Sequence, residues 1–269
     1  MRADLYLFNN SYVESRQKAQ RLIKEGHVLI DGIEIKKSSE DIDENIPHSV
    51  NITNEEKYVG RGALKLEGAL DAFGIDPSGA ICADIGASTG GFTDCLLQRN
   101  ALKVYAFDSG RGQLHPKIAS NERVVSREGF NARYMKLEDV GEKVDIVVMD
   151  VSFISQTFII PAISNIIKDG GTFVSLIKPQ FEAGRSALGK NGIVKDAKDR
   201  YAAVMRVLDC ANEFGFSCRG FVVSSIKGGD GNEEYLAHFV KTENKTDKTD
   251  MSFTVKEVIR GKRGEKNSD

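Results

Sequence analysis

Hydrophobic and polar positions follow two different patterns along the chain, and the first occupies about the first fifty residues. A polar, helix-like stretch from Arg16 to Glu25 comes after Ser15 and before Gly26, and it is followed by the segment VLIDGIEI (Val28–Ile35). Serine is favoured just before the first turn of a helix, and glycine just after the last one. An Asp-Gly pair between apolar stretches favours a tight β-hairpin. The pattern therefore predicts a small module that contains a helix and a hairpin.

From Tyr58 onward, short apolar runs alternate with longer helix-like stretches. This alternation is typical of a parallel α/β sheet with helices on its faces. The segment EYLAHFV (Glu234–Val240) fits either a helix or a strand, and the glycine-rich stretch Gly228–Gly231 before it favours an antiparallel hairpin with the preceding strand. A last helix is predicted over Ser252–Arg260. The other predicted strands are Ala80–Ile85, Lys103–Phe107, Arg123–Ser126, Val144–Met149, Thr172–Ile177 and Ser217–Ser225.

The change of pattern predicts two domains. Residues 1–52 form the small module, residues 53–59 form a polar linker, and residues 60–264 form the α/β domain. The formal net charge is −2, so the overall charge does not favour binding to nucleic acid. Any contact with RNA must therefore come from local basic patches.

Composition narrows the location and the class of protein. No apolar run approaches the roughly 18–20 residues of a membrane span, and the first residues lack the apolar stretch of a secretion signal. Cys82 and Cys95 lie in apolar contexts typical of buried thiols, which favours a reducing cytoplasm. The histidines and cysteines lack the spacing of zinc ligands. We expect a cytoplasmic protein without a metal and without membrane contact.

The predicted helix of the small module carries several basic residues. On charge alone, a solvated helix face is the favoured interpretation, because charge runs on helices are common. The whole segment SRQKAQRLIKEGHVLIDGIEIKK, however, resembles the small RNA-binding domain named after ribosomal protein S4. The resemblance implies that a basic face contacts structured RNA through its phosphates, which contribute affinity rather than sequence choice. The RNA-binding residues expected here and at the start of the second domain are Arg2, Arg16, Lys18, Arg21, Lys24, Lys36 and Arg61.

A glycine-rich turn, DIGASTGGFTD, follows the first strand of the second domain. Small residues let the backbone approach a ligand, and the helix that starts near Phe92 would point its first amides toward the same place. The turn lacks GxGxxG, and the carboxylate of Asp84 would repel a phosphate, so a dinucleotide fits poorly. Asp108 ends the next strand, where a carboxylate can accept both hydroxyls of a ribose.

An amino acid joined to adenosine without a phosphate satisfies both acids, and this ligand is S-adenosylmethionine. The alternative for Asp84 is a helix cap, and for Asp108 it is an ordinary turn residue. The residues expected to bind the cofactor are Asp84, Gly86, Ala87, Ser88, Thr89, Gly90, Gly91, Phe92 and Asp108.

Two charged residues directly follow predicted buried strands. Asp150 and Lys178 stand where open α/β sheets bind their ligands, and a charge at the end of an apolar run is costly unless it reaches that crevice. Lys65 lies on an apolar helix before the first strand, where by itself it would be an ordinary surface lysine.

Six segments in order resemble the TlyA family, also called haemolysin A, of rRNA 2′-O-methyltransferases. They are GRGALKLEGAL, DIGASTGGFTD, VYAFDSGRGQL, MDVSFIS, LIKPQFEAG and GNEEYL. The resemblance implies an α/β fold with a Rossmann-like, S-adenosylmethionine-dependent, FtsJ-like methyltransferase sheet and a small N-terminal α+β RNA-binding domain. It also implies a catalytic tetrad of Lys65, Asp150, Lys178 and Glu234, with Glu234 preferred over the adjacent Glu233.

In the reaction that the resemblance implies, a ribose oxygen attacks the sulfonium methyl in line, and no metal or covalent intermediate is needed. Lys178 would accept the proton of the hydroxyl or polarise it, with Asp150 orienting Lys178. Lys65 and Glu234 would hold the ribose and adjust the local charge. The expected partner is ribosomal RNA or a ribosomal subunit.

Three other functions remain open at this point. A non-catalytic RNA-binding or ribosome-assembly factor would keep the fold but not transfer methyl groups. A membrane-lysing protein is suggested by the haemolysin name, although no strongly amphipathic basic helix is apparent. A nicotinamide-dependent oxidoreductase is disfavoured by the missing GxGxxG.

Overall fold

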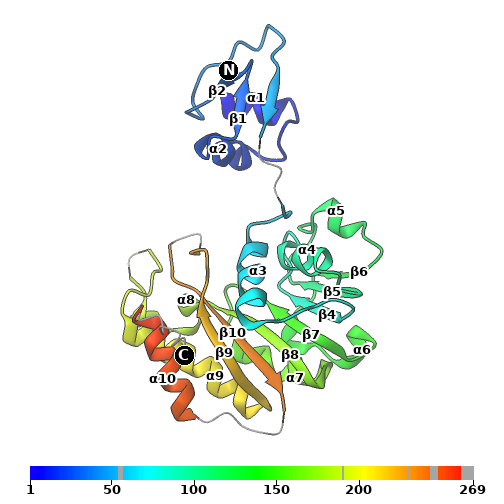
Figure 1. Ribbon diagram of the computed structural model, residues 1–269, viewed down its shortest axis with the longest axis vertical. Helices are drawn as coiled ribbons and strands as arrows, with labels where there is room; N and C mark the ends of the chain where they lie inside the picture. The colour runs from blue at the N-terminus through cyan, green and yellow to red at the C-terminus, as the bar shows by residue number, and fades with distance from the viewer. Residues whose placement is uncertain (54–56, 190, 229–230, 243–247, 262–269) are drawn as a thin grey trace, which may run out of the picture. The chain divides into compact units, whose positions relative to one another are not determined.

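The computed structural model describes residues 1–53, 57–189, 191–228, 231–242 and 248–261, and the chain divides into two compact units, Met1–Lys57 and Tyr58–Asp269 (Figure 1). Three sequence predictions lie partly outside the described residues: the middle of the linker, the centre of the Gly228–Gly231 turn, and the end of the second domain at residue 264. Each unit has its own core and is described by itself.

The first unit contains the predicted helix and hairpin. The helix is α2 (Arg16–Lys24), and the Ser15 hydroxyl accepts a hydrogen bond from the backbone N–H of Lys18 at 3.1 Å, as expected of an N-cap. The hairpin pairs β1 (Val28–Ile30) with β2 (Ile33–Glu34). Both predictions are confirmed.

Two further elements of the first unit do not stand out in the sequence. The helix α1 (Ala3–Asn9) has only seven residues, and the strand β3 (Val50–Ile52) follows an acidic polar stretch. β3 pairs antiparallel with the other edge of β1, which completes a sheet of order β2-β1-β3. Both elements depend on distant parts of the chain: β3 on its pairing with β1, and α1 on the core, to which it contributes the fully buried Leu7.

The second unit is built on a sheet of seven strands in the order β6-β5-β4-β7-β8-β10-β9. Only β10 runs antiparallel to its neighbours, so the predicted parallel α/β sheet and its final antiparallel hairpin are confirmed. The strands are β4 (Ile81–Ile85), β5 (Lys103–Asp108), β6 (Val124–Glu128), β7 (Val144–Met149), β8 (Ile167–Ile177), β9 (Phe216–Val223) and β10 (Tyr235–Lys241).

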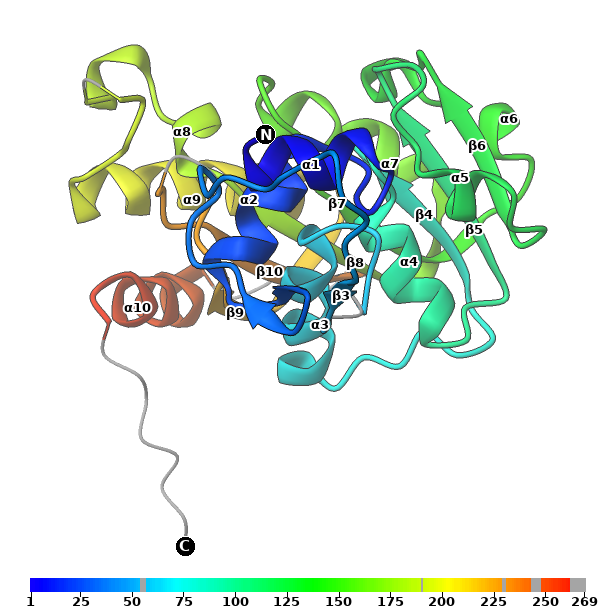
Figure 2. The same ribbon diagram turned by 90° about the horizontal axis from the view of Figure 1, so that it is seen from above.

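Helices cover both faces of this sheet, as Figure 2 shows from above. The core on one face includes α3 and α4, and the core on the other face includes α7, α9 and α10. Successive strand residues point to opposite faces, so Ala83 and Ile85 join one core while Cys82 joins the other. The helices are α3 (Gly62–Phe73), α4 (Gly91–Gln98), α5 (Pro116–Ala119), α6 (Leu137–Val140), α7 (Ile160–Ile166), α8 (Pro179–Glu182), α9 (Ala197–Glu213) and α10 (Lys248–Ile259), with short 3₁₀ turns at Ala132–Tyr134, Gln156–Phe158 and Arg185–Ala187.

Two elements of the second unit begin earlier than the sequence predicts. β8 starts at Ile167 rather than Thr172, because its first residues pair with Val144 across an irregular, glycine-containing stretch that lacks a strand pattern. α10 starts at Lys248 rather than Ser252. The sequence pattern missed this first turn because its residues are polar and show no apolar period. No helix among the described residues is long and apolar enough to span a membrane.

Candidate active site

The four residues of the expected tetrad come to one edge of the second unit's sheet. Parallel strands end at the same edge, and β10 begins there because it runs in the opposite direction. Lys65 lies on α3, Asp150 directly follows β7, Lys178 directly follows β8, and Glu234 directly precedes β10. The edge where parallel strands end is where open α/β sheets bind ligands.

These four side chains form two ion pairs. Lys65 Nζ lies 2.6 Å from Glu234 Oε2 and donates a hydrogen bond to it. Lys178 Nζ also lies 2.6 Å from Asp150 Oδ1, although the approach is not that of a hydrogen bond. The most exposed of the four side chains is Asp150, at 22%. Both pairs are therefore only weakly screened by water.

Strand register places the acid of one pair next to the lysine of the other. In the ladder between β8 and β10, Tyr235 lies opposite Ile177. Glu234 and Lys178 are the next residues beyond that pair, at the point where both strands leave the sheet. The register thus makes the two ion pairs neighbours.

The first turn of α3 connects Lys65 to the same edge. A side-chain carbon at Gly62 would lie 3.9 Å from Asp150 Oδ2, so the helix backbone passes close to that carboxylate. Lys65 lies three residues farther on, and residues at this spacing share one face of a helix. Both lysines therefore approach the same place from different elements.

Ser152 is a site residue that sequence reasoning missed. Lys178 Nζ donates a hydrogen bond to Ser152 Oγ at 2.9 Å, so the lysine is held by a hydroxyl as well as by Asp150. Phe153, next in the chain, has a φ of 64° and exposes 92% of its surface. Its ring centre lies 5.1 Å from that of Phe181. Ser152 and Phe153 both stand in the segment MDVSFIS, but only the fold shows that Ser152 contacts Lys178 and that Phe153 packs on Phe181, whose ring centre lies 6.0 Å from Lys178 Nζ.

The glycine-rich turn lies against this edge. Gly86 has a φ of 87°, and a side-chain carbon there would overlap the carbonyl oxygen of Asp150, so only glycine fits. The backbone N–H groups of Gly86 and Ala87 donate to Phe107 O, and that of Gly90 donates to Ala87 O. These three amides therefore stabilise the turn itself, and any amides available to a ligand must come from elsewhere in the turn or from the first residues of α4.

The remaining residues of the turn differ in exposure. Ser88 and Thr89 are exposed, whereas Gly90 and Gly91 are buried. The side chain of Phe92 packs in the core between α3 and α4. A ligand at this turn would therefore meet Phe92 only through its backbone.

Asp84 is a fully buried carboxylate at the end of β4. Its Oδ2 accepts a hydrogen bond from the Thr93 hydroxyl at 2.7 Å, while its buried Oδ1 has no hydrogen-bond partner within the described part of the chain. Burial raises the pKa of Asp84 to about 7, the Asp150 charge acts in the same direction, and the Thr93 hydrogen bond opposes both. An unpartnered buried carboxylate oxygen fits a cationic ligand group.

Asp108 is half-buried at the end of β5 and binds the turn. Its Oδ2 accepts from the N–H of Ser88 and its Oδ1 accepts from the N–H of Gly110, both at 2.7 Å. Each carboxylate oxygen can accept a second hydrogen bond. Asp108 therefore both orders the turn and retains capacity for two hydroxyl groups.

Replacing Asp108 with alanine is expected to weaken binding of S-adenosylmethionine by about 1–3 kcal/mol, because charge-assisted hydrogen bonds to the ribose are lost. Calorimetric titration measures the change. Asp108→Asn is the matched control, because its amide oxygen still accepts one bond, and it should lose less affinity. An unchanged affinity in the alanine variant would remove Asp108 from the cofactor site.

Binding of S-adenosylmethionine is also expected to strengthen as pH rises from about 5 to 7, by up to roughly tenfold per unit. Because the pKa of Asp84 is raised to about 7, its neutral form stabilises the free protein at low pH, and this contribution is lost as pH rises through that value. The cationic ligand favours the ionised form, so binding releases a proton. Calorimetry in buffers of different ionisation enthalpy measures the release. Asp84→Asn should bind weakly and without this pH dependence; a flat profile in the unaltered protein would contradict the contact.

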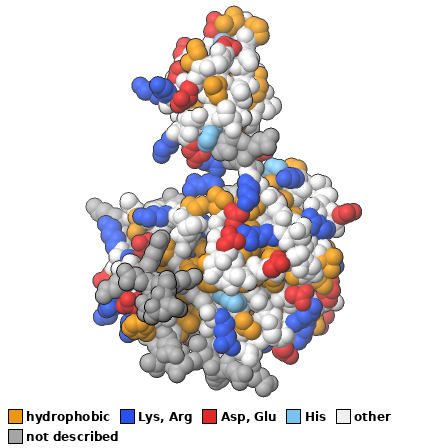
Figure 3. Space-filling view, viewed as in Figure 1, with side chains coloured by type: hydrophobic (Ala, Val, Ile, Leu, Met, Phe, Trp, Pro, Cys, Tyr) orange, Lys and Arg blue, Asp and Glu red, His pale blue; other side chains and the backbone are white. Residues whose placement is uncertain are grey.

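The expected RNA-binding residues of the first unit do not form a uniform basic patch. Figure 3 shows Lys and Arg side chains mixed with Asp and Glu side chains over its visible face. Arg2 and Arg16 both pair with Asp4, and Lys18 lies 3.4 Å from Glu14. Arg2, Arg16, Lys24, Lys36 and, in the second unit, Arg61 are exposed, whereas Lys18 and Arg21 are half-buried.

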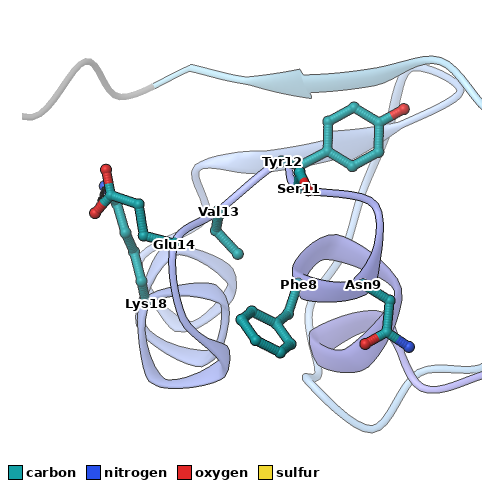
Figure 4. A pocket seen from close by; sticks show the side chains of 7 residues that line it. All are labelled: Phe8, Asn9, Ser11, Tyr12, Val13, Glu14 and Lys18. Atoms are coloured by element: carbon teal, nitrogen blue, oxygen red, sulfur yellow. Dashed lines mark hydrogen bonds and ion pairs between the residues drawn. The ribbon is translucent and has the colours of Figure 1, made fainter.

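A shallow hollow lies between the end of α1 and the start of α2 (Figure 4). The partly exposed rings of Phe8 and Tyr12 line it, together with the Lys18–Glu14 ion pair. The hollow therefore adjoins the helix that carries most of the expected RNA contacts.

Among the described residues of both units, no three His, Cys, Asp or Glu side chains gather as metal ligands would.

Comparison with known proteins identifies the families that the two units match. Residues 58–241 match the family of FtsJ-like methyltransferases, and residues 1–45 match the S4 domain. The chain belongs to the FtsJ-like methyltransferase family. The resemblance stated from the sequence is thereby confirmed, together with the α/β methyltransferase fold and its N-terminal S4 domain.

Members of this family with high similarity carry two kinds of name. A protein of Brachyspira hyodysenteriae named hemolysin A is 43% identical over 89% of this chain and 100% of its own length. The 16S/23S rRNA (cytidine-2′-O)-methyltransferase TlyA of Mycobacterium tuberculosis is 41% identical over 87% of this chain and 88% of its own. A solved Streptococcus thermophilus structure, also named as a hemolysin, has a TM-score of 0.77 and 40% identity, and the match covers 97% of this chain and 95% of the other.

Proposed function

We propose that this protein transfers the methyl group of S-adenosylmethionine to ribose 2′-hydroxyls of ribosomal RNA. The observation that carries the proposal is the pairing of Lys178 with Asp150 and of Lys65 with Glu234 at one edge of a methyltransferase sheet. A non-catalytic RNA-binding factor would have no use for two largely buried lysines at this position, because burying charges is costly.

The residues at the sheet edge fit S-adenosylmethionine. The unpartnered Oδ1 of Asp84 would accept from its ammonium group, and Asp108 would accept from its ribose hydroxyls. Gly86 lets the turn pack against the backbone of Asp150, since any side chain there is excluded, and this places the turn beside the residues proposed to hold the cofactor. The cofactor supplies an activated methyl group when bound.

Lys178 holds the reacting hydroxyl in the proposed reaction. It lies between Asp150 and Ser152, so its ammonium nitrogen has a defined position before any substrate binds. From that position Lys178 either accepts the proton of the 2′-hydroxyl as a neutral amine, or, as an ammonium group, donates a hydrogen bond that orients the hydroxyl oxygen. Positioning of this kind supplies a large part of the rate, because the attacking oxygen and the methyl carbon must be in line.

Lys65 and Glu234 act as a second, oppositely charged pair beside the first. Lys65 keeps positive charge near the hydroxyl oxygen as it loses its proton, and Glu234 holds that lysine in place through the 2.6 Å hydrogen bond. The exposed ring of Phe153 offers an aromatic surface on which a nucleobase can stack, as single-stranded RNA bases commonly do.

The proposed substrate is ribosomal RNA, free or within a ribosomal subunit, and the proposed location is the cytoplasm. Support comes from the S4 domain and from the M. tuberculosis relative whose name specifies rRNA methylation. The first unit would bind RNA phosphates and so direct the catalytic unit to its nucleotide.

Mapping of 2′-O-methyl groups in rRNA tests the proposed function. Cells that lack the protein should lose methylation at one or a few riboses, and the unaltered gene should restore it. A gene carrying Lys178→Met, expressed to the same protein level as the unaltered gene, should not restore it. Identical methylation maps with and without the protein would contradict the proposal.

A further inference from the structure

Asp4 is a fully buried carboxylate in the first turn of α1, and it is surrounded by donors from Arg2, just before that helix, and from α2. Arg2 donates from Nε and Nη2 at 3.0 and 3.1 Å, and Arg16 donates from Nε at 2.9 Å. Gln20 adds a fourth hydrogen bond at 2.6 Å. The hydrogen bond from Arg2 is the largest of several effects that hold the pKa of the Asp4 carboxyl well below its usual range. Asp4 is therefore ionised at neutral pH.

The two arginines around Asp4 differ from it in exposure. Their side chains are 45% and 46% exposed, whereas Asp4 is 0% exposed. Each guanidinium carries five N–H donors; Arg2 gives two and Arg16 one to the carboxylate. Within the described part of the chain, their other donors make no hydrogen bond to the protein, and the partly exposed side chains leave room for a ligand.

The carboxylate of Asp4 offsets the repulsion between the guanidinium groups of Arg2 and Arg16. Two guanidinium groups held side by side repel each other, and long side chains lose considerable entropy when they are fixed at a surface. A carboxylate beneath both groups offsets the repulsion and fixes both side chains before a ligand arrives. A phosphate group bound above them would then meet two oriented donors at a low entropic cost.

We propose that Asp4 is a positioning residue that holds Arg2 and Arg16 as a paired clamp for one stretch of RNA backbone phosphate. The inference rests on the proposed function, because it specifies how the first unit binds its RNA. Asp4 itself does not touch the RNA and acts through the two arginines.

For the RNA affinity of an Asp4 variant, the clamp predicts a change opposite in sign to that expected from net charge. Asp4→Asn removes a negative charge, and on net charge alone this change should strengthen binding to RNA. With the clamp lost, binding should instead weaken by about tenfold, which corresponds to the cost of immobilising two long side chains again. Glu44→Gln, at an exposed acid of the same unit, removes the same charge and should not weaken binding.

The test is a double-mutant cycle on the full-length protein, read as equilibrium binding to transcribed 16S and 23S rRNA. The variants are Asp4→Asn, the pair Arg2→Gln with Arg16→Gln, and all three changes together. The double arginine variant should bind rRNA roughly tenfold or more weakly. The slope of its log affinity against log salt concentration should also be shallower by about 1–2. Adding Asp4→Asn to that pair should change affinity by less than about twofold, since no clamp is left to disturb.

Three results would contradict these proposals, and each points to a different cause. Equal or tighter binding by Asp4→Asn would show that Asp4 only neutralises charge and would overturn the inference. A further large loss when Asp4→Asn is added to the arginine pair would show a general structural role, which thermal unfolding would also register, and would overturn it as well. If the unaltered protein bound these rRNAs no better than an unrelated RNA of equal length, the proposed function would fail instead.

Discussion

Replacing Lys178 with arginine is expected to slow methyl transfer by about 10²–10⁴-fold, nearly as much as replacing it with methionine. The reason is that a base must be able to release its proton, and a guanidinium group does not do so in a protein. Arginine would keep the positive charge beside Asp150, so charge alone would not account for a loss. Single-turnover rates at saturating cofactor and rRNA measure the chemical step directly.

Lys65→Arg is the matched control for Lys178→Arg. Lys65 is also a largely buried lysine paired to a carboxylate at 2.6 Å, but its proposed role needs only its positive charge. It should therefore retain clearly more activity. Substantial activity in Lys178→Arg would mean that Lys178 acts as an orienting donor and that the proton leaves by another route.

Stability must be measured alongside these rates. Lys178→Met leaves the carboxylate of Asp150 without its partner, and removing one member of a buried ion pair costs about 3–5 kcal/mol. Thermal unfolding and calorimetric binding of S-adenosylmethionine separate that loss from a loss of chemistry. A folded, cofactor-binding Lys178→Met protein without methyl transfer supports the catalytic assignment.

A fragment that starts at Thr53 is expected to fold and bind S-adenosylmethionine but to methylate rRNA roughly 100-fold more slowly at limiting RNA, as expected when several phosphate contacts are lost. It should fold because the second unit has its own two cores and keeps the buried Tyr58 that begins it. It should lose activity because the S4 domain, with the Arg2–Asp4–Arg16 cluster, is absent.

Rates over a range of rRNA concentrations distinguish docking from chemistry in that fragment. A docking role predicts a large rise in KM with a smaller change in kcat. Adding the first unit as a separate chain should not restore the rate at low concentration, because the covalent link supplies a high effective concentration. Full activity of the fragment at limiting rRNA would exclude the first unit as a substrate-binding element.

Local sequence patterns were sufficient for much of the fold and part of the site. As predicted, α2 begins after Ser15 and ends before Gly26, and Asp31–Gly32 forms the hairpin turn. These features could be predicted because caps and tight turns depend on a few neighbouring residues. Asp150 and Lys178 were predicted at a ligand-binding edge because each follows an apolar run, a signal that needs no knowledge of the neighbouring strand. The roles carried over from the family stay predictions until the experiments above are done.

Pairings between distant residues were decided only by the tertiary structure. Lys65 and Glu234 are 169 positions apart, and they meet because α3 covers one face of the sheet and β10 enters it antiparallel beside β8. In the same way, Asp4 reaches Arg16 only through the packing of α1 on α2. Sequence periodicity shows which side of an element is buried but not which element covers it. Partner identity, and the burial that shifts the pKa of Asp84, therefore emerge only when the chain is folded.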